Sequence, residues 1–302
     1  MVATTTATQL QFGDHVCVVV DDAEESLDVT AQVVAAGLAA GDKVMVFTEV
    51  APSTVVGGLL ERGVPVASQE RTGQLRVVPA RDSYLPTGRF EPAQMIDALV
   101  RHVDHASREG YPGLRLVGDM SWVQADPSAI GLLASYESQV SRLYLDGPAL
   151  GVCLYDRHAF GADLLQQVAC NHPATIVTDD RTDWTALLRI RRVHRPYGLR
   201  LTGEADFSNR QAVAEALGLV VDQLPDPAVP IVVDMAGVRF LDAGTAALLG
   251  TLAVRAPAGV HFTGCRGVVA TVFDCLGLID QPQLLLSRAG DSSDSVGREV
   301  TA

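Results

Sequence analysis

The stretch that decides the fold of this chain is residues 15–48, HVCVVVDDAEESLDVTAQVVAAGLAAGDKVMVFT. It opens with a run of β-branched residues, which favours a buried strand. Asp21 and Asp22 follow and can cap a helix whose apolar residues recur at helical spacing as far as Leu38. Residues 44–48, VMVFT, predict a second buried strand. A strand, helix and strand in this order need a right-handed crossover, so we expect the two strands to be parallel.

The same alternation continues through the first half of the chain. Glycines such as Gly63 and Gly110 mark the expected helix ends. We expect further strands at residues 75–79, 114–117 and 149–155, and helices at 53–62, 92–108 and 127–143. Strands that alternate with helices imply a mostly parallel sheet covered on both faces, so this half is predicted to be an α/β domain.

The composition of the chain changes after Ile176. VTDDRTDW is polar and LLRIRRVHR carries four arginines, so we predict a linker at residues 178–191. A second α/β pattern follows, with strands expected at 199–202, 231–235 and 260–263 and helices at 208–224, 243–253 and 268–276. The last residues, 287–302, are predicted to be a disordered tail. The chain is therefore expected to form two domains, residues 12–177 and 192–286, which suits its length of 302 residues.

The net charge and the cysteines indicate the class of partner and the compartment. A formal net charge of −13 disfavours binding to nucleic acid or to anionic membranes, and favours a protein partner or a small ligand. No secretory signal or membrane-spanning stretch is recognisable, so we expect a soluble cytoplasmic protein. The five cysteines include no Cys-x-x-Cys pair and are expected to be reduced core residues. Whether the chain forms a homodimer stays open.

Several catalytic and cofactor motifs are missing from the sequence. It contains no G-x-x-x-x-G-K-[ST] loop, so ATP hydrolysis of the P-loop kind is not expected. No G-x-G-x-x-G follows the first strand, and no G-x-S-x-G occurs. We therefore expect no cofactor and no catalytic residues.

The carboxyl ends of the predicted strands hold the candidate ligand-binding residues, because open parallel sheets bind ligands beyond those ends. The alternative is that Trp122 belongs to the core and that the carboxylates cap helices or pair with arginines. The full candidate set comprises His15, Cys17, Asp21, Asp22, Glu49, Asp119, Ser121, Trp122, Tyr155, Asp156 and Arg157.

Two pairs of residues have the spacing of metal ligands. His15 and Cys17 alternate on one face of a strand, and His102 and His105 lie a helical turn apart. Neither pair completes a metal site, and we interpret His15 as a satisfied edge histidine. No metal site is predicted. The Tyr136-Glu137 pair is assigned to a helix surface or pocket rim.

The second half resembles the STAS family of anti-sigma-factor antagonists over about residues 193–286. The resemblance rests on GEADFSNRQAVAEAL, IVVDMAGVRFLDAGTAALLGTLA and GVHFTGCRGVVATVFDCLGL. It implies that Asp242, Ala243, Gly244 and Thr245 bind a partner such as an anti-sigma factor. Where the family commonly has a phosphorylatable Ser or Thr directly after the Asp, this chain has Ala243. Asp242 can also act as a plain helix cap.

The first half resembles the MEDS sensory domains over about residues 12–177. The resemblance rests on GDHVCVVVDDAEES, GLAAGDKVMVFTE, YLPTGRFEPAQM, EGYPGLRLVGDMSW and CLYDRHAF. It implies a KaiC-like or RecA-like α/β fold that senses small organic molecules, including hydrocarbon-derived ones. Val20 replaces a common Tyr, and Asp119 replaces a common Glu.

Two functions remain open from the sequence. In the first, a sensory domain controls a STAS domain that acts as an antagonist-like protein-binding module in transcription regulation. In the second, the crevice of the first domain is the site of a small-molecule enzyme and the STAS domain is its regulator. The second lacks a recognisable catalytic constellation.

Overall fold

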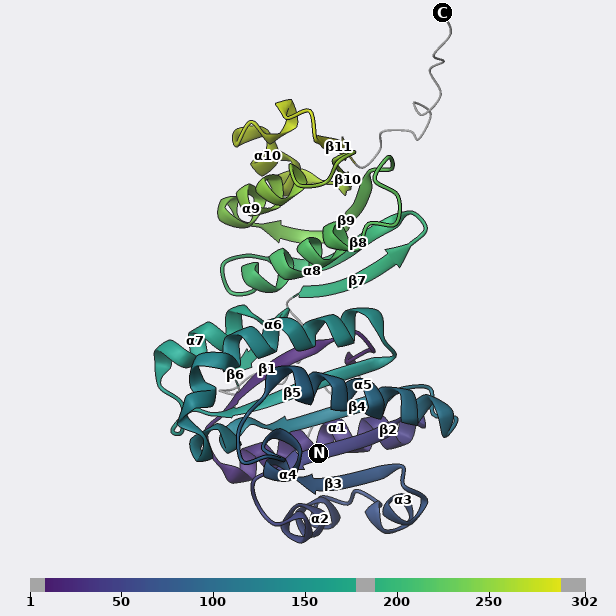
Figure 1. Cartoon of the computed structure of the whole chain (residues 1–302), viewed down its shortest axis with the longest axis vertical. Helices are drawn as coiled ribbons and strands as arrows, with labels where there is room; N and C mark the ends of the chain where they lie inside the picture. Colours follow the sequence, from purple (N-terminus) through teal and green to yellow (C-terminus); the bar gives the residue numbers. More distant parts are fainter. Residues whose placement is uncertain (1–8, 178–187, 289–302) are drawn as a thin grey trace, which may run out of the picture. The chain divides into compact units, whose positions relative to one another are not determined.

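The computed structural model describes residues 9–177 and 188–288, and the chain divides into two compact units. The first unit is built on a six-stranded sheet of order β3-β2-β4-β5-β1-β6 (Figure 1). All neighbouring strands in this sheet are parallel, which confirms the α/β fold class predicted for this half. The strands are β1 (His15–Val20), β2 (Lys43–Thr48), β3 (Leu75–Pro79), β4 (Leu114–Asp119), β5 (Ala149–Asp156) and β6 (Ala174–Val177).

Helices cover both faces of this sheet. They are α1 (Ala23–Ala40), α2 (Pro52–Glu61), α3 (Val66–Thr72), α4 (Ala80–Tyr84), α5 (Pro92–Arg108), α6 (Ile130–Asp146) and α7 (Ala162–Cys170). Successive residues of a strand point to opposite faces. Val16 and Val18 of β1 therefore pack in the core that includes α1, α2 and α3, whereas Cys17 and Val19 pack in the core that includes α4 to α7.

The first strand, helix and strand form as the sequence predicts. The Asp22 carboxylate caps α1 by accepting a hydrogen bond from the backbone N–H of Glu25, at 2.9 Å. Gly41 ends the helix with a φ of 79°, in the left-handed region that favours glycine. The capping aspartate thus lies directly beyond the carboxyl end of β1, where a ligand crevice is expected.

The second half of the chain, from residue 188 on, is built on a five-stranded sheet of order β11-β10-β9-β8-β7. Its strands are β7 (Leu188–His194), β8 (Tyr197–Ala205), β9 (Ile231–Leu241), β10 (Val260–Cys265) and β11 (Leu284–Arg288), and its helices are α8 (Arg210–Asp222), α9 (Ala243–Ala253) and α10 (Gly267–Cys275). β8, β9, β10 and β11 pair in parallel. α9 follows β9 through Asp242 alone, so the end of this central strand fixes where α9 begins.

Two predicted boundaries need correction. Residues 188–191 were assigned to a linker because of their arginines, but they belong to β7. Leu188 and Ile190 are buried whereas Arg189 and Arg191, which alternate with them, are only partly buried, and this is the alternation of a half-buried strand. Residues 287 and 288, assigned to the tail, belong to β11. The remaining predicted linker and tail, 178–187 and 289–302, lie outside the described residues.

Gly151 of β5 offers a test of this packing. A side chain at this position would overlap the Tyr144 hydroxyl in the core. We predict that Gly151→Ala lowers the free energy of unfolding by about 1–3 kcal/mol, because overpacking a dense core displaces its neighbours. Urea unfolding of the full chain measures the change.

Gly131 of α6 is the matched control, because it is exposed and a Cβ added there meets nothing within 4 Å. Gly131→Ala should leave stability unchanged or raise it by up to about 1 kcal/mol, as in other helices. Equal stability of Gly151→Ala and the wild type would contradict the packing of Tyr144 against β5.

Candidate functional site

A cavity of about 340 Å³ opens at the carboxyl ends of β1, β2, β4 and β5. Its inner wall is apolar and includes Val20, Val46 and Phe47. Of the predicted ligand-binding residues, the structure brings the following together along this cavity: Asp22, Glu49, Asp119, Ser121 and Asp156. The position follows from the topology, because parallel strands end at one edge of the sheet and their loops leave a crevice there.

The carboxylates of this crevice accept backbone hydrogen bonds. Asp119 accepts from the N–H groups of Ser121 at 3.0 Å and Glu49 at 3.2 Å. Asp156 accepts from the N–H of His158 at 2.7 Å, and Asp22 caps α1. These contacts fix the turns after β1, β4 and β5.

Arginines lie near two more of the predicted acids. Arg157 Nε lies 2.9 Å from Asp21 Oδ1, and Arg81 Nε lies 2.9 Å from Glu49 Oε2. Both arginines are solvent-exposed, so these pairs contribute little to stability. The described residues that line the cavity include no lysine or arginine. The crevice is therefore acidic around an apolar wall.

The structure does not bring the remaining predicted residues into this crevice. Trp122 is fully buried and stacks on Tyr84, with ring centroids 4.6 Å apart. It is a core residue, which was the alternative interpretation. Cys17 and Tyr155 are fully buried as well, on the face of the sheet covered by α4 to α7.

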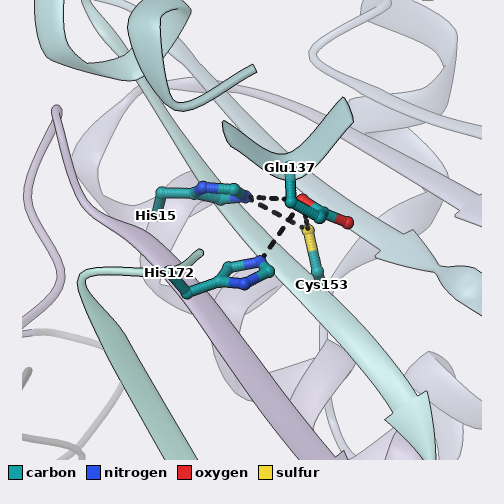
Figure 2. Close-up of side chains that lie close together, drawn as sticks. All are labelled: His15, Glu137, Cys153 and His172. Carbon is teal, nitrogen blue, oxygen red and sulfur yellow. Dashed lines mark hydrogen bonds and ion pairs between the residues drawn. The ribbon is translucent and has the colours of Figure 1, made fainter. Parts of the chain in front are cut away.

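His15 belongs to a second group of polar side chains, buried inside the first unit. The interpretation of His15 as an edge histidine is wrong, because β1 lies between β5 and β6. Its ring faces Cys153 of β5, Glu137 of α6 and His172, which lies between α7 and β6 (Figure 2). One ligand-type atom from each of these residues lies within 4.8 Å of all the others. We call these residues the buried cluster.

Hydrogen bonds from outside the buried cluster orient its members. His15 Nδ1 lies 2.9 Å from the Ser141 Oγ, whose hydroxyl donates to the Glu137 carbonyl. His172 Nδ1 lies 2.8 Å from the carbonyl oxygen of Val168 and donates to it. The Tyr155 hydroxyl donates to Glu137 Oε1 at 2.5 Å. Both imidazoles thus carry their hydrogen on Nδ1 and direct a lone pair on Nε2 toward Glu137.

Burial sets the protonation of the buried cluster. It lowers the pKa of His15 to about 3 and that of His172 to about 4, so both rings are neutral at physiological pH. It raises the pKa of the Glu137 carboxyl, against the opposing influence of His172 and the Tyr155 hydroxyl. It also raises the pKa of the Cys153 thiol well above its usual range. Desolvation in each case disfavours the charged form.

Sequence reasoning missed most of the buried cluster. The Tyr136-Glu137 pair was assigned to a helix surface or pocket rim, but both side chains are buried. The signal for Glu137 was its position four residues after Leu133 and three before Val140, on the apolar face of α6. His172 and Cys153 carried no comparable local signal.

Comparison with protein families identifies both halves. The first unit has a parallel α/β sheet with a crevice at the ends of its strands, and the second sheet is separate from it. The model of the methanogen/methylotroph, DcmR sensory domain, abbreviated MEDS, matches residues 14–173, more than half of the chain. A STAS domain model, described as Mlab, matches residues 188–286. The chain belongs to the MEDS family and carries a STAS domain after the MEDS domain.

Solved structures resemble the chain only distantly. Flagellar accessory protein FlaH from Methanocaldococcus jannaschii is 9% identical, with a TM-score of 0.42 over 67% of this chain and 82% of its own. An uncharacterized protein from Pyrococcus horikoshii, in complex with an unknown peptide, is 14% identical, with a TM-score of 0.46 over 64% and 94%. A KaiC-like protein from Pyrococcus horikoshii OT3 is 11% identical, with a TM-score of 0.39 over 63% and 77%. No curated protein matches the sequence.

None of the helices in the described ranges combines the length and the apolar character that a membrane crossing needs.

The acidic side chains of the crevice lead us to expect that it does not bind nucleotides. The turn after β1 presents Asp21 and Asp22 where a P-loop presents backbone amides and a lysine, so phosphates would meet like charge. We predict that calorimetric titration of the full chain with Mg-ATP shows no binding in the micromolar range, and that titration with Mg²⁺ alone gives the same heats. Micromolar ATP affinity with measurable turnover would contradict this account of the crevice.

Proposed function

We propose that this protein is a signalling regulator in which the MEDS domain senses a small ligand and controls a STAS domain that binds a partner protein as an anti-sigma-factor antagonist does. The observation that carries the proposal is the amino end of α9. Asp242 Oδ1 accepts a hydrogen bond from the Thr245 N–H at 2.6 Å, and Ala243 and Gly244 are exposed beside it. A helix start of small residues gives a partner close access to the backbone.

Apolar residues extend this surface. Ala205 pairs with Leu241 across β8 and β9, so the end of β8 lies beside the start of α9. Phe240, next to this pair, is 42% exposed, and Phe207 is 63% exposed. Aromatic side chains at a solvent-accessible surface are typical anchors of protein interfaces. We define the α9 docking surface as Phe207, Phe240, Ala243 and Gly244.

The α9 docking surface carries no phosphorylatable residue at the position expected from the STAS resemblance. Ala243 occupies that position, and Thr245, the nearest hydroxyl residue in α9, is fully buried. A kinase needs an accessible hydroxyl. We therefore propose that partner binding does not depend on phosphorylation, and that access to the docking surface is set by the sensory domain.

The sensed ligand is proposed to bind in the crevice of the MEDS domain. The cavity of about 340 Å³ accommodates a small organic molecule. Its apolar wall would contact the body of the ligand, and its acidic rim suits a cationic or hydrogen-bond-donating end. We propose no catalytic role for the crevice. The Asp119 and Asp156 carboxylates accept hydrogen bonds from backbone N–H groups in the turns beside it. The described residues that line it include no hydrogen-bonded pair of a nucleophile and a base.

Charge at the start of α9 tests the docking proposal. We predict that Ala243→Glu weakens binding to the cognate anti-sigma factor by roughly 30-fold or more, because an unpaired charge in an interface costs about 2–5 kcal/mol. The fold should survive, since negative charge near a helix amino end is mildly stabilising. Ala243→Ser, unphosphorylated, should bind as the wild type does. Titration calorimetry with purified partner candidates measures the affinities.

Ala228→Glu is the matched control, because Ala228 is exposed and precedes β9, whereas Ala243 follows it. This variant should keep the wild-type affinity. Undiminished binding by Ala243→Glu, or phosphate on Thr245 in the native protein by intact-mass analysis, would refute the proposal.

A further inference from the structure

We propose that His15, Glu137, Cys153 and His172 form a binding site for one divalent transition-metal ion, with Zn²⁺ the best fit. The site lies in the core of the MEDS domain, on the face of the sheet opposite the α1 core. It is separate from the crevice and from the α9 docking surface. The inference rests on the geometry, orientation and charge of the buried cluster.

Four of the six donor–donor distances in the buried cluster are close to those of a tetrahedral site, and the other two are no longer than 4.8 Å. Zn–N and Zn–O bonds of about 2.0–2.1 Å and Zn–S bonds of about 2.3 Å place neighbouring donors about 3.3–3.6 Å apart. Glu137 Oε2 lies 3.3 Å from His15 Nε2 and 3.4 Å from His172 Nε2. Cys153 Sγ lies 3.4 Å from His15 Nε2 and 3.9 Å from Glu137 Oε2. A single ion can therefore bridge the donors with only small side-chain movements.

Both imidazoles are oriented as metal ligands. Metal-bound histidine usually donates its other ring N–H to a carbonyl, carboxylate or hydroxyl group, which fixes the tautomer. His172 does so through Val168 and His15 through Ser141. Nε2 of His172 has no hydrogen-bond partner among the described residues, although it is fully buried. A buried polar atom without a partner is costly, and a metal ion would satisfy it.

The charges in the buried cluster also favour a cation. Glu137 is fully buried, and among the described residues its only ion-pair contacts are to the two histidines. A buried carboxylate without a counter-charge is strongly disfavoured. One divalent ion, the Glu137 carboxylate and the Cys153 thiolate sum to zero charge. Metal binding would release the thiol proton, because a coordinating thiol is deprotonated.

The donor set selects the class of metal. Nitrogen, sulfur and a single carboxylate suit zinc and its neighbours, whereas calcium and magnesium require oxygen ligands. Tyr155 donates to the other oxygen of Glu137 and would orient that ligand. All the proposed ligands come from the protein and are buried, which is typical of closed sites. Such an ion would tie β1, β5, α6 and the turn before β6 together.

Cobalt substitution in the full chain tests the site. Metal-free protein, prepared by unfolding with a chelator and refolding, is titrated with Co²⁺. We expect one Co²⁺ per chain, with intense visible bands of tetrahedral geometry and a near-ultraviolet thiolate-to-cobalt band, and we expect Zn²⁺ to displace it. Cys153→Ser should lose the thiolate band. Cys17→Ser should keep it, since Cys17 is a buried neighbour in β1 outside the proposed ligand set.

Tyr155→Phe keeps every ligand and provides a second readout. Loss of its hydrogen bond to Glu137 should weaken Co²⁺ binding by roughly 10–100-fold. Wild-type affinity in Tyr155→Phe would overturn the proposal, as would a folded wild-type protein that takes up no Co²⁺. A thiolate band that survives Cys153→Ser but disappears in Cys17→Ser would also overturn it.

Discussion

The parallel pairing of β1 with β5 is the interaction on which the rest of the MEDS domain depends. Its register places Val20 opposite Asp156, so that the turns of the crevice begin side by side. It also places His15 opposite Gly151, where the missing side chain leaves room for Tyr144, whose ring packs against the His15 ring at 4.7 Å. Shifting the register by one residue would turn His15 to the other face of the sheet. The crevice and the buried cluster therefore share one structural origin.

The polar groups of the chain differ in how deeply they are buried, and the role that we propose for each group follows from its burial. The acids Asp22, Asp119 and Asp156 line an open crevice and are fixed by backbone hydrogen bonds. Glu137 is enclosed between neutral imidazoles and a thiol, where a carboxylate without a cation is unstable. In the STAS domain the start of α9 is exposed instead, with Asp242 saturating the Thr245 N–H and Ala243 leaving the backbone accessible. The proposed ligand crevice, the proposed metal site and the proposed docking surface thus occupy three different parts of the chain.

The sequence predicted what depends on local periodicity. The α/β fold class of both halves, the cap at Asp22 and the acidic strand ends of the crevice follow from patterns within a few residues. The boundary at β7 failed because arginines that alternate with apolar residues along a strand give it the composition of a linker. The buried cluster failed for a different reason: His15 and His172 are far apart in the sequence, and only the sheet brings them together. Glu137 had a signal, a charge on the apolar face of α6, but a helix alone does not show what faces it.

The most direct measurement of the central claim, that β1 and β5 hold a metal centre in the core, is X-ray absorption at the zinc edge on the full chain loaded with one equivalent of Zn²⁺. If the buried cluster binds zinc, the Zn²⁺ ion should have one sulfur neighbour at about 2.3 Å and nitrogen or oxygen neighbours at about 2.0–2.1 Å, in four-coordinate geometry. A first shell without sulfur, or one of six oxygen-type neighbours as for a surface-bound ion, would contradict it.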